Sequence, residues 1–362
     1  MKGITILAAA LLAMPVAARA QEASLKSTTI GGTAFLDFSN IAHTADGIKQ
    51  KGNGTNLDLK RFYVVVGHTF DRIWSANITT DATYDGTAKA SQIFIKKAWI
   101  QAKVAGDLLT VRLGSADLPW VPFAESLYGY RYVENTLIDR TKYGTSADWG
   151  AHVFGNMTFG SLADGLVSYQ LSVLNGAGYK KAPIGGGANR SKSLDVEGRV
   201  SLRYDDFVLG VGGYNGKLGQ DIQGGAPTYH SASRFNAVAA WVTDDVRAGV
   251  EYFQAGNWNN IGTLARDSAE GWSGFASYRF LPGFAAFARY DDVAPSRKIN
   301  PALRENYYNL GVTWSPAKAV DLSLVYKRGQ ASHGTISTTN GDIGGRRSGA
   351  YDEAGLFAQI KW

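Results

Sequence analysis

Apolar and polar residues alternate with a period of two in sixteen separate segments of the chain. This period is typical of β-strands that have one apolar face and one polar face. The segments span residues 28–39, 56–70, 74–85, 92–104, 108–115, 147–159, 166–176, 194–204, 207–216, 234–242, 246–256, 271–280, 284–292, 306–315, 320–329 and 350–362. Because the pattern recurs along the chain, the sequence predicts an all-β protein.

The connections between these segments alternate between two kinds. Short turns such as 205–206 and 281–283 join the two members of a pair, whereas long loops rich in Gly, Asn and Ser, such as 217–233 and 329–349, join one pair to the next. Short turns at one end and long loops at the other are typical of outer-membrane barrels, which have an even number of strands. The sequence therefore predicts one domain over residues 21–362, a 16-stranded antiparallel transmembrane β-barrel with short periplasmic turns and long extracellular loops.

The two faces of each predicted strand differ in polarity. One face of 234–242 carries Phe235, Ala237, Ala239 and Trp241, whereas the other begins with Arg234. An Arg or Lys facing lipid costs roughly 2–4 kcal/mol at the midplane, so the apolar face is predicted to meet lipid. Its aromatic residues lie near the two ends of the strands, as membrane girdles do. Beside short turns or the C-terminus these are Phe70, Trp74, Trp241, Phe280, Phe284, Trp314 and Trp362; beside long loops they are Tyr252, Trp272, Tyr290, Tyr308 and Tyr326.

The chain ends on the alternating strand GLFAQIKW, residues 355–362, with no polar tail. An exposed strand edge promotes aggregation unless it is paired. We therefore expect this strand to pair with segment 28–39 and close the barrel. A C-terminal aromatic strand also resembles the signal that the outer-membrane assembly machinery recognises.

The first twenty residues have the composition of a secretory signal. Lys2 precedes an apolar stretch from Ile4 to Ala18, and Ala18-Arg19-Ala20 offers a small-x-small cleavage site. Residues 1–20 are therefore expected to be removed on export through the periplasm. No apolar run in the remainder approaches the roughly 18–20 residues of a membrane helix.

Several kinds of chemistry are disfavoured by composition. The chain has no cysteine, which excludes disulfides and thiolate metal sites, and its five histidines are dispersed without metal-ligand spacing. A lipid-hydrolysing barrel would need a Ser and a His on one strand face, and His68 and His152 have no compelling serine partner in the sequence. We expect no enzyme activity, cofactor or metal, and no nucleic-acid partner, because the positive charges lie on the predicted inward face instead of forming a surface patch.

Sixteen strands leave an aqueous channel, so passive diffusion of small hydrophilic solutes is the expected function. Basic residues on the inward face outnumber acidic ones, and rings of Arg or Lys favour anions or phosphate in pores. The inward acids are Asp81, Asp195, Glu197, Glu251, Asp291 and Asp321. The basic candidates are Arg61, Arg112, Arg199, Arg203, Arg234, Arg247, Arg279, Arg289, Lys327 and Lys361. The alternative is that these charges pair across neighbouring strands and leave little ion selectivity.

The connection over residues 116–144 differs from the other long loops because it is aromatic and poor in Gly and Asn. We expect it to fold into the barrel and constrict it. Both cations and acids of this loop could meet a solute, so the sign of the electrostatic field stays open. The cations are Arg131, Arg140 and Lys142, and the acids are Glu125, Glu134 and Asp139. Its aromatic residues could form a stacking track for sugars or anchor the loop to the wall; they are Trp120, Phe123, Tyr128, Tyr130 and Tyr132.

Three stretches within 56–156 together resemble the phosphate-selective (O/P-type) porins of Gram-negative outer membranes. They are LKRFYVVVGHTF (59–70), KKAWIQAKV with LLTVRLGSADLPW (96–104 and 108–120), and YVENTLIDRTKYGTSADWGAHVFG (132–155). In this resemblance Arg112-Leu113-Gly114 is the R-x-G strand end, and Arg140 is the arginine before the next strand. The sequence departs from the family in lacking a dense Arg/Lys cluster within the inward loop.

The resemblance implies a homotrimeric channel in contact with outer-membrane lipid and lipopolysaccharide, with transport of anions such as phosphate. A general or sugar-type diffusion porin with little selectivity is the alternative within this class. A non-channel barrel, such as an outer-membrane lipid hydrolase or an adhesin that binds through its long loops, is the alternative outside it.

Overall fold

The structure is a computed structural model that describes residues 26–85, 90–158, 165–181 and 190–362. The expected signal sequence, residues 1–20, lies outside these described residues. Among the described residues, no helix is long and apolar enough to cross a membrane.

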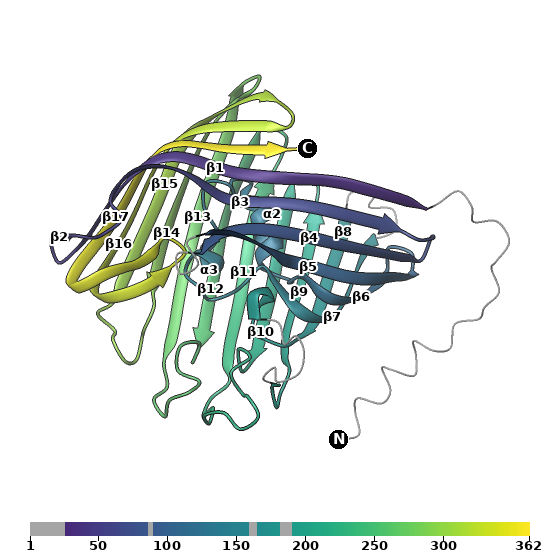
Figure 1. Ribbon diagram of the computed structural model, residues 1–362, viewed down its shortest axis with the longest axis horizontal. Helices are drawn as coiled ribbons and strands as arrows, with labels where there is room; N and C mark the ends of the chain where they lie inside the picture. The colour runs from purple at the N-terminus through teal and green to yellow at the C-terminus, as the bar shows by residue number, and fades with distance from the viewer. Residues whose placement is uncertain (1–25, 86–89, 159–164, 182–189) are drawn as a thin grey trace.

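Sixteen strands of nine or more residues form one closed antiparallel barrel, as the sequence pattern predicts. The first and last strands, purple and yellow in Figure 1, pair from Thr33–Lys361 to Ala45–Gly349 and so close the sheet. The short strand β2 (Ile48–Lys49) pairs only with the end of β1 and lies in the first long loop. The barrel strands are β1 (Ser27–Ala45), β3 (Gly54–Thr69), β4 (Trp74–Asp85), β5 (Ala90–Ala105), β6 (Leu109–Asp117), β7 (Ala147–Thr158), β8 (Gly165–Leu174), β9 (Asp195–Tyr204), β10 (Phe207–Gly216), β11 (Ala232–Val242), β12 (Val246–Gly256), β13 (Ser268–Leu281), β14 (Phe284–Ala294), β15 (Arg304–Ala317), β16 (Val320–Thr338) and β17 (Gly341–Lys361).

Burial alternates along the strands with the predicted parity. Val250 and Leu324 are exposed on the outer face, whereas their neighbours Glu251 and Ser323 are buried on the inner face. The aromatic residues predicted as girdles lie on the outer face, and several pack in neighbouring pairs. Phe207–Trp241 and Phe284–Trp314 stack beside the short turns, and Trp272–Tyr290 and Tyr308–Tyr326 pack nearer the long loops. We refer to these two ends of the barrel as the turn end and the loop end.

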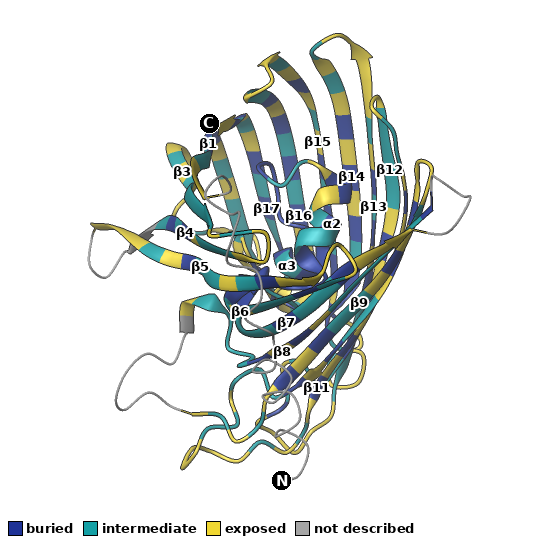
Figure 2. Cartoon of the chain, turned by 90° about the vertical axis from the view of Figure 1, so that its right-hand side faces the viewer, coloured by how far each residue is buried: buried dark blue, intermediate teal, exposed yellow. Residues whose placement is uncertain are grey.

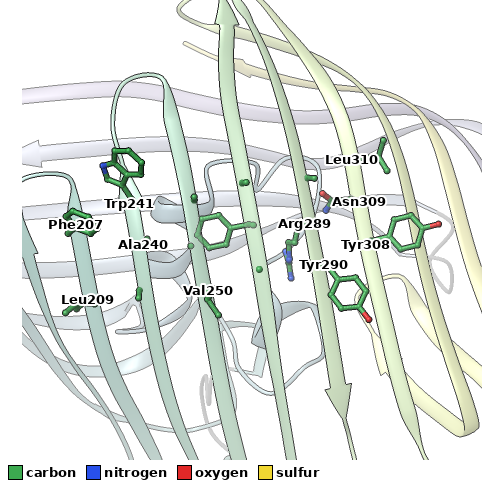
Figure 3. A pocket seen from close by; sticks show the side chains of 17 residues that line it. Phe207, Leu209, Ala240, Trp241, Val250, Arg289, Tyr290, Tyr308, Asn309 and Leu310 are labelled. Carbon is green, nitrogen blue, oxygen red and sulfur yellow. The ribbon is translucent and has the colours of Figure 1, made fainter.

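Small residues between these aromatic rows leave a shallow groove on the outer face of β10 to β15. Figure 3 shows it with Phe207 and Trp241 on one side and Tyr290 and Tyr308 on the other. The groove has a volume of about 800 Å³, and Ala and Gly residues form much of its floor.

The segment between β6 and β7, residues 118–146, lies inside the barrel, and we call it the inner loop. It contains the helices α2 (Val121–Tyr128) and α3 (Leu137–Arg140), which lie within the ring of strands in Figure 2. Pro122 stands in the first turn of α2, and Gly129 ends this helix with a φ of +80°, a conformation that favours glycine. The apolar core of the molecule therefore lies inside the barrel, where Trp120, Leu127 and Ile138 of the loop join Phe253 and Phe275 of the wall.

The last connection differs from the prediction. Residues 329–349 were expected to form a long loop, which is wrong: β16 and β17 continue as one hairpin and turn at Thr339-Asn340. A bulge at His333 and Gly334, both with positive φ, interrupts the register, and Ile336 and Ile343 are paired and buried beyond it. Gly, Ser and Thr make this segment resemble a loop, but its β-branched residues still alternate.

The C-terminal strand forms the seam of the barrel. The N–H of Trp362 donates to the carbonyl of Gly32 over 3.2 Å, and the N–H of Gly32 donates back over 3.0 Å. The Trp362 ring lies 5.3 Å from Phe62 and occupies the space that a Cβ at position 32 would need. The seam thus depends on a tryptophan on one strand and a glycine on the other.

Deleting Trp362 is expected to lower the yield of folded barrel, because both seam hydrogen bonds and the ring contact are lost. The measurement is the fraction of heat-resistant, detergent-stable barrel on electrophoresis after refolding. Trp314→Ala is the matched control, since Trp314 lies on the outer face at the same end but away from the seam. Equal yields for the deletion and the control would show that the terminal residue does not govern closure.

Candidate functional site

The inner loop is fixed along one wall of the barrel, from β9 to β16. At its start, the Trp120 N–H donates to Glu197 over 3.1 Å, and its indole N–H donates to Glu251 over 2.7 Å. Further along, the Tyr132 hydroxyl lies 2.5 Å from the Ser323 hydroxyl. These contacts place the loop against β9 to β16 and leave the space beside β3 to β8.

Arg140 forms the most buried contact between the loop and this wall. Its guanidinium donates to Asp291 over 2.9 Å and to both oxygens of Glu305 over 2.7 and 3.0 Å. All three side chains are 0% exposed, and the guanidinium also lies 4.2 Å from the Tyr307 ring. Arg140 therefore joins the loop to the wall and does not face open space.

Five other cations of the predicted set also bind the inner loop. Each donates to a backbone carbonyl of the loop: Arg199 to Pro119, Arg234 to Tyr143, Arg247 to Ser126, Arg289 to Asn135 and Lys327 to Val133. Three of them also pair with wall acids: Arg234 with Glu197, Arg289 with Asp291, and Lys327 with Glu353. The sequence identified these side chains as inward-facing, but it could not show that the loop itself is their partner.

The aromatic residues of the loop pack mainly against the same wall. Tyr130 stacks on Phe287 at 4.1 Å, and Tyr128 packs edge-on against Phe275 at 5.7 Å. Phe123 lies under the guanidinium of Arg199 at 4.2 Å. Of the two roles that the sequence left open, this geometry corresponds to anchoring.

The opposite side of the lumen carries ion pairs that are partly open to solvent. Arg61 pairs with Asp81 at 2.9 Å, and its side chain is 22% exposed. Lys97 pairs with Asp117 at 2.9 Å and is 23% exposed. These values contrast with the buried cations of the loop-bearing wall, so the open part of the lumen lies along β3 to β6.

The inner loop presents its own charged residues to this open side. Arg131 lies 2.5 Å from Glu125 and 3.7 Å from Asp139, and all three side chains are partly exposed. Burial raises the pKa of Glu125, and the adjacent Arg131 opposes that shift. Arg61 and Arg131 line one cavity, and the region between them thus contains the cations and the carboxylates of both sets of ion pairs.

Three cations near the open side have no carboxylate partner among the described residues. Lys96 donates to the Tyr63 hydroxyl over 3.1 Å, Arg112 donates to Gln101 over 2.7 Å, and the ammonium of Lys180 lies over the Phe94 ring. Burial lowers the pKa of Lys180, and the nearby cations Arg61 and Lys96 lower it further. Asp58, near the loop end of β3, accepts a hydrogen bond from the Asn56 amide and has no ion pair among the described residues.

The remaining predicted cations lie away from the inner loop. Arg203 is half-buried near the turn end of β9, and Lys361 is exposed at the end of β17. Arg279 is exposed at the turn end of β13 and pairs with Asp245 at 3.2 Å. None of the three has a described contact with the inner loop.

The tip of the β16–β17 hairpin docks on the inner loop, which no part of the sequence analysis anticipated. The Thr339 N–H donates to the carbonyl of Arg140 over 2.8 Å, and the Asn340 amide donates to Glu134 over 2.7 Å. Glu134 also lies 3.6 Å from Lys327. A cavity of about 210 Å³ remains between the hairpin tip, the inner loop, Lys60 and Arg61.

The sequence analysis also missed a serine partner for one histidine. His152 on β7 has its Nδ1 2.8 Å from the Ser172 hydroxyl on β8. Both side chains are fully buried, so a solute in the lumen does not reach them. Among the described residues, no group of three or more His, Asp or Glu side chains is arranged to hold a metal ion.

No protein-family model and no curated protein sequence matches this chain. Solved structures do match over nearly the whole chain. The anion-selective porin from Comamonas acidovorans has a TM-score of 0.65 at 13% identity, covering 93% of this chain and 100% of that one. The outer-membrane channel DcaP of Acinetobacter baumannii has a TM-score of 0.60 at 12% identity, covering 94% and 98%. OmpT, an outer membrane protein of Vibrio cholerae, has a TM-score of 0.58 at 13% identity, covering 94% and 100%. At these identities the likeness shows a shared fold.

Arg140→Ala is expected to destabilise the docked inner loop by roughly 3–5 kcal/mol, because Asp291 and Glu305 would remain buried without a cation. The expected result is faster proteolysis within 118–146 and a lower melting temperature in detergent. Arg279→Ala removes an exposed ion pair instead and should cost about 0–1 kcal/mol. Equal proteolysis of the two variants would contradict a clamping role for Arg140.

The contacts of Glu134 should depend on pH only under acidic conditions. Burial acts to raise the pKa of Glu134, but Lys327 and Lys60 lower it from 4.5 to about 2. The folded protein therefore favours the ionised form, and this stabilisation is complete above pH 4.5 and lost as the pH falls toward 2.

The difference in melting temperature between the native protein and Glu134→Gln should accordingly be constant from neutral pH to about pH 5 and shrink below it. Melting is followed by circular dichroism in detergent at each pH. A difference that shrinks between pH 8 and 6, or that persists unchanged to pH 2, would contradict this assignment.

Proposed function

We propose that this protein is an outer-membrane porin, a passive diffusion channel for small hydrophilic solutes with a preference for anions such as phosphate. The observation that supports this proposal is the division of the barrel into an exposed apolar outer face and a polar, partly open interior. In water, so large an apolar surface would be an aggregation hazard. In a bilayer it is the face that a closed barrel presents to lipid, because every backbone hydrogen bond is made within the sheet.

The fold shared with solved structures supports the same proposal. One of those structures is described as an anion-selective porin and another as an outer-membrane channel. At 13% and 12% identity, their functions come to this chain as a hypothesis only. OmpT of Vibrio cholerae is described in a trimer form, which agrees with the homotrimer that the sequence resemblance implies.

The proposed solute path runs between the inner loop and the wall formed by β3 to β6. Buried ion pairs fix the loop to the other wall. The width of the path is therefore set by a fixed loop and does not require a conformational change. Along β4 to β6, Asp81, Lys97 and Asp117 are paired, whereas Lys96 and Arg112 have no carboxylate partner among the described residues. Lys180, in the loop after β8, has none there either. An excess of positive charge on low-dielectric walls favours anions.

The proposal includes the cellular context that the sequence predicts. It comprises export with residues 1–20 as a removable signal, insertion by the outer-membrane assembly machinery, and contact with outer-membrane lipid and lipopolysaccharide. The two aromatic rows would then lie at the two membrane interfaces.

Planar-bilayer recording in a salt gradient tests the proposal. Arg131→Gln leaves Glu125 and Asp139 without their cation, so the reversal potential should shift toward cation selectivity, with a change in permeability ratio of roughly two- to fivefold. Glu125→Gln removes a charge from the same cluster and should shift the potential the opposite way. Lys103→Gln is the control, because Lys103 is exposed at the turn end of β5, where it pairs with Asp107.

Correctly folded protein that inserts without conductance would overturn the channel proposal. Identical potentials for Arg131→Gln, Glu125→Gln and the control would mean that the inner loop does not set selectivity. Block of the current by glucose but not by inorganic phosphate would favour the sugar-type alternative. Arg140 is unsuitable for this test, since its substitution disturbs the loop itself.

A further inference from the structure

A cavity of about 570 Å³ lies on the loop-end side of the inner loop, apart from the Arg131 and Arg61 ion pairs. It is bounded by the end of the inner loop, the loops after β8 and β10, the strands β9 to β11, and the loop between β12 and β13. The helix η1 (Tyr179–Lys181) forms one side of it. Small-molecule sites commonly have volumes of about 300–1,000 Å³, so this cavity is large enough for one small solute.

Aromatic and aliphatic side chains form the body of this cavity. Trp258 and Tyr179 are half-buried, and each is held in place from behind. The indole N–H of Trp258 donates to the carbonyl of Lys142 over 3.0 Å, and its ring packs on Tyr214 at 5.1 Å. Tyr179 stacks on Phe94 with ring centroids 6.0 Å apart and planes 13° apart. Rings that are already ordered can bind an apolar group with little further loss of conformational entropy.

The carboxylates of the cavity wall and the Tyr214 hydroxyl are already engaged. Glu197 pairs with Arg234 at 3.0 Å, the Tyr214 hydroxyl donates to Asp195, and Asp148 accepts the backbone N–H of Trp149 over 2.7 Å. A sugar would need several free donors and acceptors at its hydroxyl groups. This wall is therefore poorly suited to a sugar.

Two lysines supply the free positive charges of the cavity. Lys142 and Lys180 are both exposed, and within the described part of the chain neither ammonium has a carboxylate partner. Lys142 lies in a turn of the inner loop with a φ of +60°, a conformation that residues other than glycine rarely adopt. Its own carbonyl accepts the hydrogen bond from the Trp258 indole N–H. The lysines thus place positive charge beside an apolar surface.

We propose that this cavity binds organic anions, in which a ring or short apolar body carries a carboxylate or phosphate group. The apolar body lies against Trp258, Tyr179 and Leu218, and the anionic group pairs with Lys142 and Lys180. This inference deepens the proposed function, on which it rests for the transport step. Beyond this cavity, the ammonium of Lys96 lies 5.6 Å from the centroid of the Tyr179 ring. The site would therefore provide a first binding step ahead of the region between Arg61 and Arg131.

Calorimetry on the detergent-solubilised full chain tests binding without any assumption about transport. The probes are benzoate and phenyl phosphate, with acetate and inorganic phosphate as partners that lack the ring. Benzoate is expected to bind at least roughly tenfold more tightly than acetate, since burying one ring face removes apolar area from water. Phenyl phosphate should likewise bind more tightly than inorganic phosphate. The ring-bearing probe with the higher affinity identifies the preferred anionic group.

Two kinds of variant separate the charge from the apolar body. The double variant Lys142→Ala with Lys180→Ala should weaken the binding of benzoate roughly five- to tenfold, because the carboxylate loses two solvent-exposed ion pairs. Tyr179→Ser should remove much of the preference for benzoate over acetate and leave acetate binding unchanged. Lys192→Ala is the matched control, an exposed lysine that lies outside the cavity and pairs with Asp221.

Equal affinities for benzoate and acetate, or equal losses in the double variant and in Lys192→Ala, would overturn the inference. A neutral sugar that binds more tightly than benzoate would overturn it as well. Bilayer recording distinguishes the two proposals. Conductance without benzoate binding would contradict only the proposed binding site in the cavity. Benzoate binding without conductance would contradict only the proposed channel function.

Discussion

The buried ion pairs of Arg140 with Asp291 and Glu305 determine how the interior of this barrel is divided. Three charges taken fully out of water are tolerated only where each has close, well-oriented partners. That requirement fixes the inner loop to one wall, and the loop then accepts hydrogen bonds from five further cations of the same wall. The open part of the lumen is therefore displaced to the opposite side, along β3 to β6, where the ion pairs remain partly exposed.

The barrel could be predicted from the sequence because its determinants are local. Alternation, turn length and the penalty for placing Arg in lipid each act within one strand or one hairpin, so strand number, parity and closure follow without knowledge of distant contacts. The hairpin of β16 and β17 was mistaken for a loop for the same reason. Its Gly, Ser and Thr content carries a weak local signal, and its stability depends on contacts with Arg140 and Glu134 that lie far away in the sequence.

The candidate site could be predicted only in part. The inward orientation of Arg61, Arg131 and Arg289 follows from strand parity and loop position. Whether each guanidinium is buried in an ion pair or exposed to the lumen does not follow from them. Arg289 is buried in an ion pair, whereas Arg61 is partly exposed to the lumen. The sequence alone does not distinguish them, because both are inward-facing arginines on strands. The Trp258 and Lys142 contact joins two loops, and no spacing in the chain would indicate it.

The field in the lumen consequently depends on which charges the inner loop uses. A count of inward Arg and Lys overestimates the positive potential, since most of these cations pair with nearby carboxylates. On the open side, the described cations without a carboxylate partner include Lys96, Arg112, Lys142 and Lys180, and all of these but Lys142 lie over aromatic rings. Arg199 and Arg247 have no described carboxylate partner either, but they donate to carbonyls of the inner loop. In the proposed channel, an anion that passes the open-side cations would lose water on one side and gain a cation and a ring face on the other. Such surroundings would add to the proposed anion preference a further preference for anions that carry an apolar group, because the ring faces bind that group while the cation holds the charge.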